Sequence, residues 1–204
     1  MKKFTLIVAL FLGFFATQAQ EENKFRFDFG LGYTVPKGGG GVLFHLEPKW
    51  NIKDNMAVGL RYQVALMGKE IQPVGDNQGE AVEGTISGNA SYLGTFEYNF
   101  NKGNSSFAPF VGAGVGYFAI ANVEVSVDTV AGAESDSVAA ETSGKFGGML
   151  RTGFDWGKFR LAAEYNLIPK SEVQDLNGNV TGEVSNGYFG ISLGFFLGGG
   201  KWGR

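Results

Sequence analysis

The side chain best suited to acid–base chemistry in this 204-residue sequence is its single histidine, His45. A catalytic histidine needs a serine or similar nucleophile within about 3 Å and an acid that orients its ring. The spacing of the sequence singles out no serine as such a partner. Zinc sites built from several histidines, and all thiolate sites, are excluded because the chain has one histidine and no cysteine. We therefore interpret His45 as structural and predict no catalytic residue, no metal ion and no cofactor.

Carboxylates are the next candidates, because two of them could serve as the acid and base of a glycosidase. Glu97 and Glu164 could form such a pair, since each lies on the polar side of an alternating segment. Arginines lie on the polar sides of these segments as well, so we expect ion pairs rather than catalysis. The predicted polar network consists of Arg26, Asp28, His45, Glu47, Arg61, Glu97, Arg151, Asp155, Arg160 and Glu164.

The glycine-rich stretch at 112–116 is not a dinucleotide-binding fingerprint, because its glycines alternate inside a strand pattern and open no helix. Glycine within a strand permits close packing, which is our first interpretation. The alternative is a small cavity, lined by Phe110, Gly112, Gly114, Gly116 and Phe118.

Two loop segments also suggest cation binding only weakly. The stretch 175–179 has its glycine at the wrong position for a calcium loop. Its Asn-Gly pair instead predicts a hairpin turn, with the last two strands continuing as a ribbon. The acidic segment 126–144 has no basic residue before Gly144 and is typical of a solvated loop. Divalent cations that bridge it to lipopolysaccharide phosphates are the alternative.

The candidate residues lie on strands. In LRTGFDWGKFRLAAEYN, residues 150–166, apolar and polar residues alternate on both sides of a Gly-Lys turn, which predicts an antiparallel hairpin. Eight segments follow this period of two, near 25–33, 42–50, 56–66, 90–100, 107–118, 146–156, 159–166 and 188–197.

The connections between these segments alternate in length. From the second onward, short and long connections follow one another, which places tight turns at one end of a meander and long loops at the other. The predicted connections are 35–41, 51–55, 68–88, 101–106, 126–144, 157–158 and 169–186.

The first nineteen residues have the composition of a secretory signal peptide. Lys2 and Lys3 precede an apolar stretch, and Thr17 and Ala19 are small residues at positions −3 and −1 of a cleavage site before Gln20. We expect a signal peptide at 1–19, a barrel domain at 20–197 and a short tail at 198–204. A net charge of −3 gives no indication of nucleic-acid binding.

The same alternation suits a soluble barrel, with apolar residues inside, or a membrane barrel, with apolar residues outside. The polar side is rich in glycine, alanine and serine and carries charges of both signs, which suits the narrow lumen of an eight-stranded barrel. Segments of about 9–11 residues match a tilted crossing of the bilayer. Aromatic residues mark the segment ends, as in membrane-interface belts: Phe25, Tyr33, Trp50, Tyr62, Phe100, Phe107, Tyr117, Trp156, Phe159 and Tyr165. The fold prediction is an all-β, eight-stranded antiparallel up-and-down transmembrane β-barrel.

With its signal peptide, loop pattern and final segment YFGISLGFFLGG, the chain resembles the small outer-membrane β-barrels of the porin-like superfamily, which includes the OmpA transmembrane domain, OmpX and OmpW. The resemblance implies a Gram-negative outer membrane, lipid and lipopolysaccharide as neighbours, and a barrel-insertion machinery that reads a terminal aromatic residue. Phe196 and Trp202 are both candidates for that residue.

We expect a protein without enzymatic activity, with a largely plugged lumen and a role in envelope integrity or in surface interaction through its long loops. The alternatives are a narrow transporter of small or apolar solutes, as in OmpW, a lipid-modifying outer-membrane enzyme and a soluble ligand-binding barrel. Nothing in the sequence indicates the oligomeric state.

Overall fold

The computed structural model describes residues 23–36, 39–70, 84–101, 105–125, 140–174 and 180–199. The predicted signal peptide, its cleavage site, the tail from residue 200 onward with Trp202, and most of the acidic segment 126–144 lie outside the described residues.

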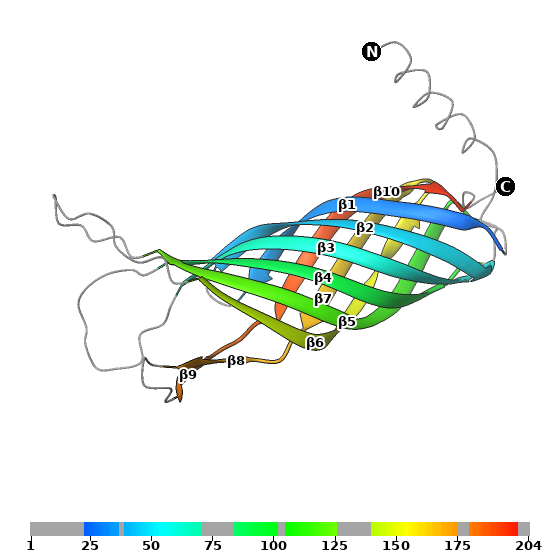
Figure 1. Ribbon diagram of the computed structural model, residues 1–204. Coiled ribbons are helices and arrows are strands. Elements are labelled where there is room, and N and C mark those ends of the chain that lie inside the picture. Colours follow the sequence, from blue (N-terminus) through cyan, green and yellow to red (C-terminus); the bar gives the residue numbers. More distant parts are fainter. Residues whose placement is uncertain are drawn as a thin grey trace, which may run out of the picture.

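Eight long strands form a closed barrel in which every neighbouring pair is antiparallel (Figure 1). Each strand pairs with the next along the chain, and β1 closes the barrel against β10. This confirms the predicted fold. The barrel strands are β1 (Phe25–Pro36), β2 (Gly39–Lys53), β3 (Met56–Glu70), β4 (Gly84–Asn99), β5 (Phe107–Val125), β6 (Ala140–Trp156), β7 (Phe159–Leu167) and β10 (Tyr188–Gly198).

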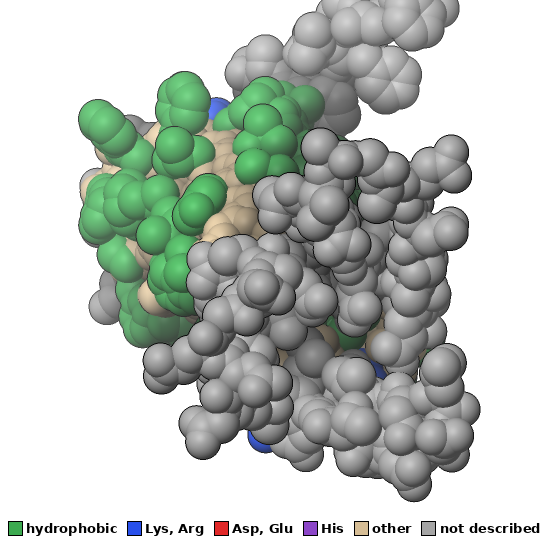
Figure 2. Space-filling view, turned by 90° about the vertical axis from the view of Figure 1, so that its left-hand side faces the viewer, with side chains coloured by type: hydrophobic (Ala, Val, Ile, Leu, Met, Phe, Trp, Pro, Cys, Tyr) green, Lys and Arg blue, Asp and Glu red, His purple; other side chains and the backbone are tan. Residues whose placement is uncertain are grey.

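Alternation along each strand decides which side faces the interior. In β7, Arg160 and Glu164 are buried, whereas Phe159 and Tyr165 are exposed. Successive side chains of a strand point to opposite faces, so one polar and one apolar series line the two sides of the wall. Hydrophobic side chains accordingly crowd the part of the outer wall visible in Figure 2. This inside-out arrangement is that of a barrel surrounded by lipid rather than water.

Six of the eight barrel strands are longer than the expected 9–11 residues, and β7 and β10 are within that range. The strands range from 9 residues in β7 to 19 in β5, and β6 has 17. Because about 9–11 residues already cross the bilayer, the surplus carries β3 to β6 beyond the ends of β7 and β10, which makes one side of the barrel taller (Figure 1). The period of two set no upper limit on strand length, since inward and outward residues continue to alternate where a strand extends beyond the bilayer.

The tight turns Asp54–Asn55 and Gly157–Lys158 lie at one end of the barrel, termed here the turn end, where β4 ends and β5 begins as well. Gly157 has a φ of 63°, a left-handed conformation that glycine adopts without strain. At the opposite, loop end, β1 and β2 are separated only by residues 37–38, so the predicted connection 35–41 is mostly strand.

The strands that flank Asn177-Gly178 pair as predicted, but not as a continuation of the barrel, and the turn between them lies outside the described residues. β8 (Ser171–Gln174) and β9 (Val180–Val184) make a separate two-stranded sheet. Non-strand residues at 168–170 and 185–187 divide it from β7 and β10. No helix within the described ranges is long and apolar enough to cross a membrane.

Candidate functional site

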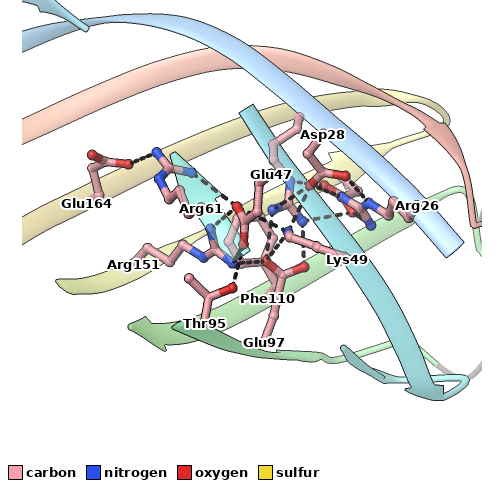
Figure 3. Close-up of polar contacts among 12 residues, drawn as sticks. Arg26, Asp28, Glu47, Lys49, Arg61, Thr95, Glu97, Phe110, Arg151 and Glu164 are labelled. Carbon is pink, nitrogen blue, oxygen red and sulfur yellow. Dashed lines mark hydrogen bonds and ion pairs between the residues drawn. The ribbon is translucent and has the colours of Figure 1, made fainter. Parts of the chain in front are cut away.

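All ten residues of the predicted polar network are buried in the interior of the barrel. Each of them has at most 4% of its surface exposed. They project from six of the eight barrel strands, and the charged side chains labelled in Figure 3 point toward one another in the lumen.

An eleventh member, Lys49, was missed by the sequence prediction. Its side chain is buried, and its ammonium lies 2.8 Å from Oδ2 of Asp28 and 2.9 Å from Oε2 of Glu97. The alternation already placed Lys49 on the polar side, two residues after Glu47, but Pro48 obscured the end of that strand. With Lys49 included, five cations face five carboxylates: Arg26, Lys49, Arg61, Arg151 and Arg160 with Asp28, Glu47, Glu97, Asp155 and Glu164.

Glu47 is the most heavily bonded carboxylate on the loop side of this network. Arg151 donates to both of its oxygens, at 2.6 and 2.8 Å, in a bidentate pair. Thr95 donates at 2.6 Å and Arg61 at 3.2 Å. Figure 3 shows these three side chains converging on Glu47.

Glu97 has an equivalent role nearer the turn end. Arg160 donates to its two oxygens at 2.6 and 2.8 Å, and Arg151 lies 3.1 Å away. Arg160 also donates to Asp155 at 2.7 Å, and Arg26 bridges Asp155 to Asp28. Buried charges are costly unless they are paired and hydrogen-bonded, and this network meets that condition.

The two glutamates considered as a glycosidase pair have separate sets of hydrogen-bond donors. Glu164 accepts from Arg61 at 2.5 Å and from Gln63 at 2.7 Å, neither of which donates to Glu97. Both carboxylates are therefore engaged within the network.

Two aromatic rings close the network at the turn end. The guanidinium of Arg26 lies 3.6 Å from the ring centre of Phe196, and that of Arg160 lies 4.0 Å from the ring centre of Phe110. Both contacts have cation–π geometry. Phe196, one of the two candidates for the terminal insertion residue, is thus fully buried in the lumen, whereas its neighbour Phe195 faces outward.

The glycines of β5 border filled space rather than the small cavity considered above. A Cβ placed on Gly112 would lie 2.9 Å from Nε of Arg151, and one on Gly114 would lie 3.2 to 3.3 Å from Thr95 and Met149. Glycine suits these positions because side chains from the neighbouring strands β4 and β6 lie against the inner face of β5 there.

The loop-end half of the lumen contains an apolar cluster, which the sequence prediction did not foresee, beside buried polar residues such as Ser87 and Asn89. The cluster consists of Leu43, Ala65, Met67, Leu93, Phe118, Ile120, Met149, Ile168 and Tyr188. Phe118, proposed as a cavity residue, belongs to this cluster. His45 lies close to Gly30, buried, and its Nδ1 has no hydrogen-bond partner. The sequence signal that could have predicted this cluster was the presence of apolar residues at the inward positions 43, 67 and 149.

The outer surface carries aromatic residues at two heights. Of the ten predicted interface aromatics, Tyr62 is half-buried and the other nine are exposed. A turn-end belt is formed by cross-strand neighbours, Phe25 opposite Trp50 and Phe107–Trp156–Phe159 in a row. A tyrosine belt nearer the loop end contains the row Tyr62–Tyr92–Tyr117 together with Tyr33 and Tyr165. Tyr92 was absent from the predicted set.

Leu60, Val115, Leu150 and Leu193 lie between the belts and are 56–70% exposed. Such an apolar band between aromatic belts suits the hydrocarbon core of a bilayer. Among the described residues, no group of three or more His, Cys, Asp or Glu side chains could hold a metal ion.

No protein-family model matches this chain, and no curated protein sequence does either. Among solved structures, the outer membrane protein OprG from Pseudomonas aeruginosa has a TM-score of 0.54 at 14% sequence identity, and the match covers 88% of this chain and 97% of OprG.

Two other outer-membrane structures show a weaker likeness. The N-terminal β-barrel domain of Pseudomonas aeruginosa OprF has a TM-score of 0.47 at 14% identity, over 88% of this chain and 99% of that domain. Ail, the attachment invasion locus protein of Yersinia pestis, has a TM-score of 0.47 at 11% identity, over 87% and 99% of the two chains. From the closed antiparallel topology and the likeness to OprG, the chain has the fold of a small eight-stranded outer-membrane β-barrel.

Proposed function

We propose that this protein is an integral outer-membrane barrel whose lumen is plugged, and that it acts in envelope integrity or surface interaction through its loop end. The observation that carries the proposal is the neutral network of five cations and five carboxylates inside a wall with an apolar outer surface. A solute crossing the lumen would have to separate pairs such as Arg151–Glu47 and then pass the apolar cluster, at a cost of several kcal/mol for each unpaired buried charge.

The location follows from the same features. The apolar outer band requires lipid, and a barrel satisfies all of its backbone hydrogen bonds within the wall. The predicted signal peptide supports export. OprG, which has the same fold, is described as an outer membrane protein, and this supports an outer-membrane location for the present chain.

Membrane fractionation combined with heat-modifiability in detergent gels tests this proposal. The expected result is a detergent-requiring protein in the outer-membrane fraction, with a compact band that shifts on boiling. Release of the folded chain by buffer alone would contradict it. In planar bilayers, the reconstituted protein should show no steady single-channel openings.

A narrow transporter of small apolar solutes is the second candidate, favoured by the apolar cluster in the loop-end half of the lumen. This function requires the charged layer below to open. Gly114→Phe would place a ring in the lumen beside Thr95 and Met149. Steady openings of the wild type that this variant abolishes would favour transport over the plugged barrel.

We propose no enzymatic activity. His45 is buried in the lumen and its Nδ1 has no hydrogen-bond partner, so no acid orients that nitrogen. Mass spectra of lipid A should be identical for the wild type and His45→Ala. A modification of lipid A that disappears in His45→Ala would instead support the lipid-modifying enzyme.

A further inference from the structure

The barrel wall has a notch where the tall strand β6 rises beside the short strand β7. Pairing between the two begins at Gly148, opposite Leu167. Above it, Ala140–Gly147 pairs with β5 on one side, and on its other side no described residue pairs with it. A sheet edge of this kind exposes unpaired backbone groups.

A pocket of about 320 Å³ occupies this notch. It is lined by Phe146 and Gly147 of β6, Tyr165 and Leu167 of β7, and Ile168 and Pro169 that follow β7, with the small residue Ser185 across from them. Its volume lies at the lower end of the range for small-ligand sites. Ile168 is only 8% exposed and belongs to the apolar cluster of the lumen, so the back of the notch is apolar and closed.

The notch opens onto the lipid-facing surface at the height of the tyrosine belt. Phe146 is the cross-strand neighbour of Tyr117, and Tyr165 is itself a belt residue. Phe146 is 75% exposed and Leu167 47% exposed. Tyrosine belts mark the depth at which acyl chains join their head groups, so the molecule already present at the mouth of this notch is a lipid.

A lysine follows the lining residues along the chain. Lys170 comes directly after Pro169 and is exposed. An ammonium at the head-group level attracts phosphate, while the apolar walls below it suit a hydrocarbon chain.

We propose that the β6–β7 notch is a binding site for one anionic, phosphate-bearing membrane lipid, with an acyl chain between Phe146 and Leu167 and the phosphate beside Lys170. The site deepens the proposed function, because it requires the outer surface to lie in a bilayer. It would attach a lipid where Ala140–Gly147 of β6 has no described partner on one side, and so seal that edge.

Native mass spectrometry tests the site. The full-length mature barrel is refolded in mild detergent with equal amounts of phosphatidylglycerol and phosphatidylcholine. The wild type should retain one lipid, with phosphatidylglycerol preferred. Ser185→Phe places a ring in the notch and should lower lipid occupancy at least tenfold. Ala163→Phe adds a ring of the same size to the outward face of β7 outside the notch and should leave occupancy unchanged.

Lys170→Gln separates the head-group contribution from that of the chain. This variant should still retain one lipid but bind both head groups equally. Retention of no lipid by the wild type, or equal retention by Ser185→Phe, would overturn the site.

A fluorescence measurement covers the case in which Ser185→Phe does not fold. In a background with the three native tryptophans changed to Phe, Leu167→Trp should be quenched more strongly by brominated phosphatidylglycerol than Tyr92→Trp, which lies in the same belt away from the notch. Equal quenching would contradict the site. Heat-modifiability of each variant, measured in parallel, reports the proposed barrel itself, so its failure is distinct from failure of the lipid site.

Discussion

Nζ of Lys49 lies 2.9 Å from Oε2 of Glu97, a contact that joins β2 to β4 across the lumen rather than along the wall. The same ammonium contacts Asp28 at 2.8 Å, so one lysine connects three strands. Because lysine is the fifth cation against five carboxylates, the interior is neutral only when Lys49 is present.

Removal of this lysine should therefore destabilise the barrel strongly. We expect Lys49→Met to lower the free energy of unfolding by about 3–5 kcal/mol, because it leaves the buried network with one more negative than positive charge. Urea unfolding in lipid vesicles, followed by tryptophan fluorescence, measures the change. Lys53→Met, at the exposed end of the same strand, is the matched control and should change stability by no more than about 0.5 kcal/mol. Equal effects of the two substitutions would contradict the role of Lys49.

The bidentate pair between Arg151 and Glu47 should show strong energetic coupling. Arg151→Met and Glu47→Gln should each cost about 3–5 kcal/mol, because each leaves the buried network with one uncompensated charge, whereas the double variant removes both charges together. We expect the double variant to lose at least about 2 kcal/mol less than the sum of the single losses. Additive losses in this double-mutant cycle would show that the two side chains act independently.

The inward glycine Gly112 should tolerate no side chain, because Nε of Arg151 occupies the position next to it. Gly112→Val should displace Arg151 from Glu47 and lower the stability by about 1–3 kcal/mol, as overpacking of a core does. Gly94→Val is the control on the lipid-facing side, where the nearest atom to an added Cβ lies 3.9 Å away. Since valine suits strands better than glycine does, Gly94→Val should be neutral or stabilising. Heat-modifiability midpoints of the two variants provide the comparison.

The tyrosine belt depends on glycines in the neighbouring strands. The hydroxyl of Tyr117 lies where a Cβ of Gly144 would be, and Tyr33 covers Gly40 in the same way. Aromatic rings that cover strand glycines help to hold sheets together. Gly144→Ala should therefore push the Tyr117 ring away and lower stability by about 1 kcal/mol. Gly148→Ala, where the nearest atom is 3.5 Å from the added Cβ, should have little effect, and unfolding of both variants in vesicles checks this.

The residue pattern alone predicted the number of barrel strands, their antiparallel order and the fold. A strand directs successive residues to opposite faces, so the alternation in segments such as 150–166 carries this information locally. Burial of Arg26, Glu47 and Glu164, together with exposure of Leu150 and Phe159, follows that phase in the structure. The pairing of β8 with β9 followed from an equally local signal, because the Asn-Gly pair between them favours a hairpin.

Only the tertiary structure determined which cationic side chain pairs with which carboxylate. Arg61 contacts Glu164 across a separation of 103 residues, and Lys49 contacts Glu97 across 48. These distances depend on the register of all eight strands and on closure of the barrel, neither of which leaves a trace in the period of a single strand. For the same reason, only the structure revealed that Gly112 makes room for Arg151, that an apolar cluster lies in the loop-end lumen, and that β6 extends beyond β7 to leave a notch in the wall.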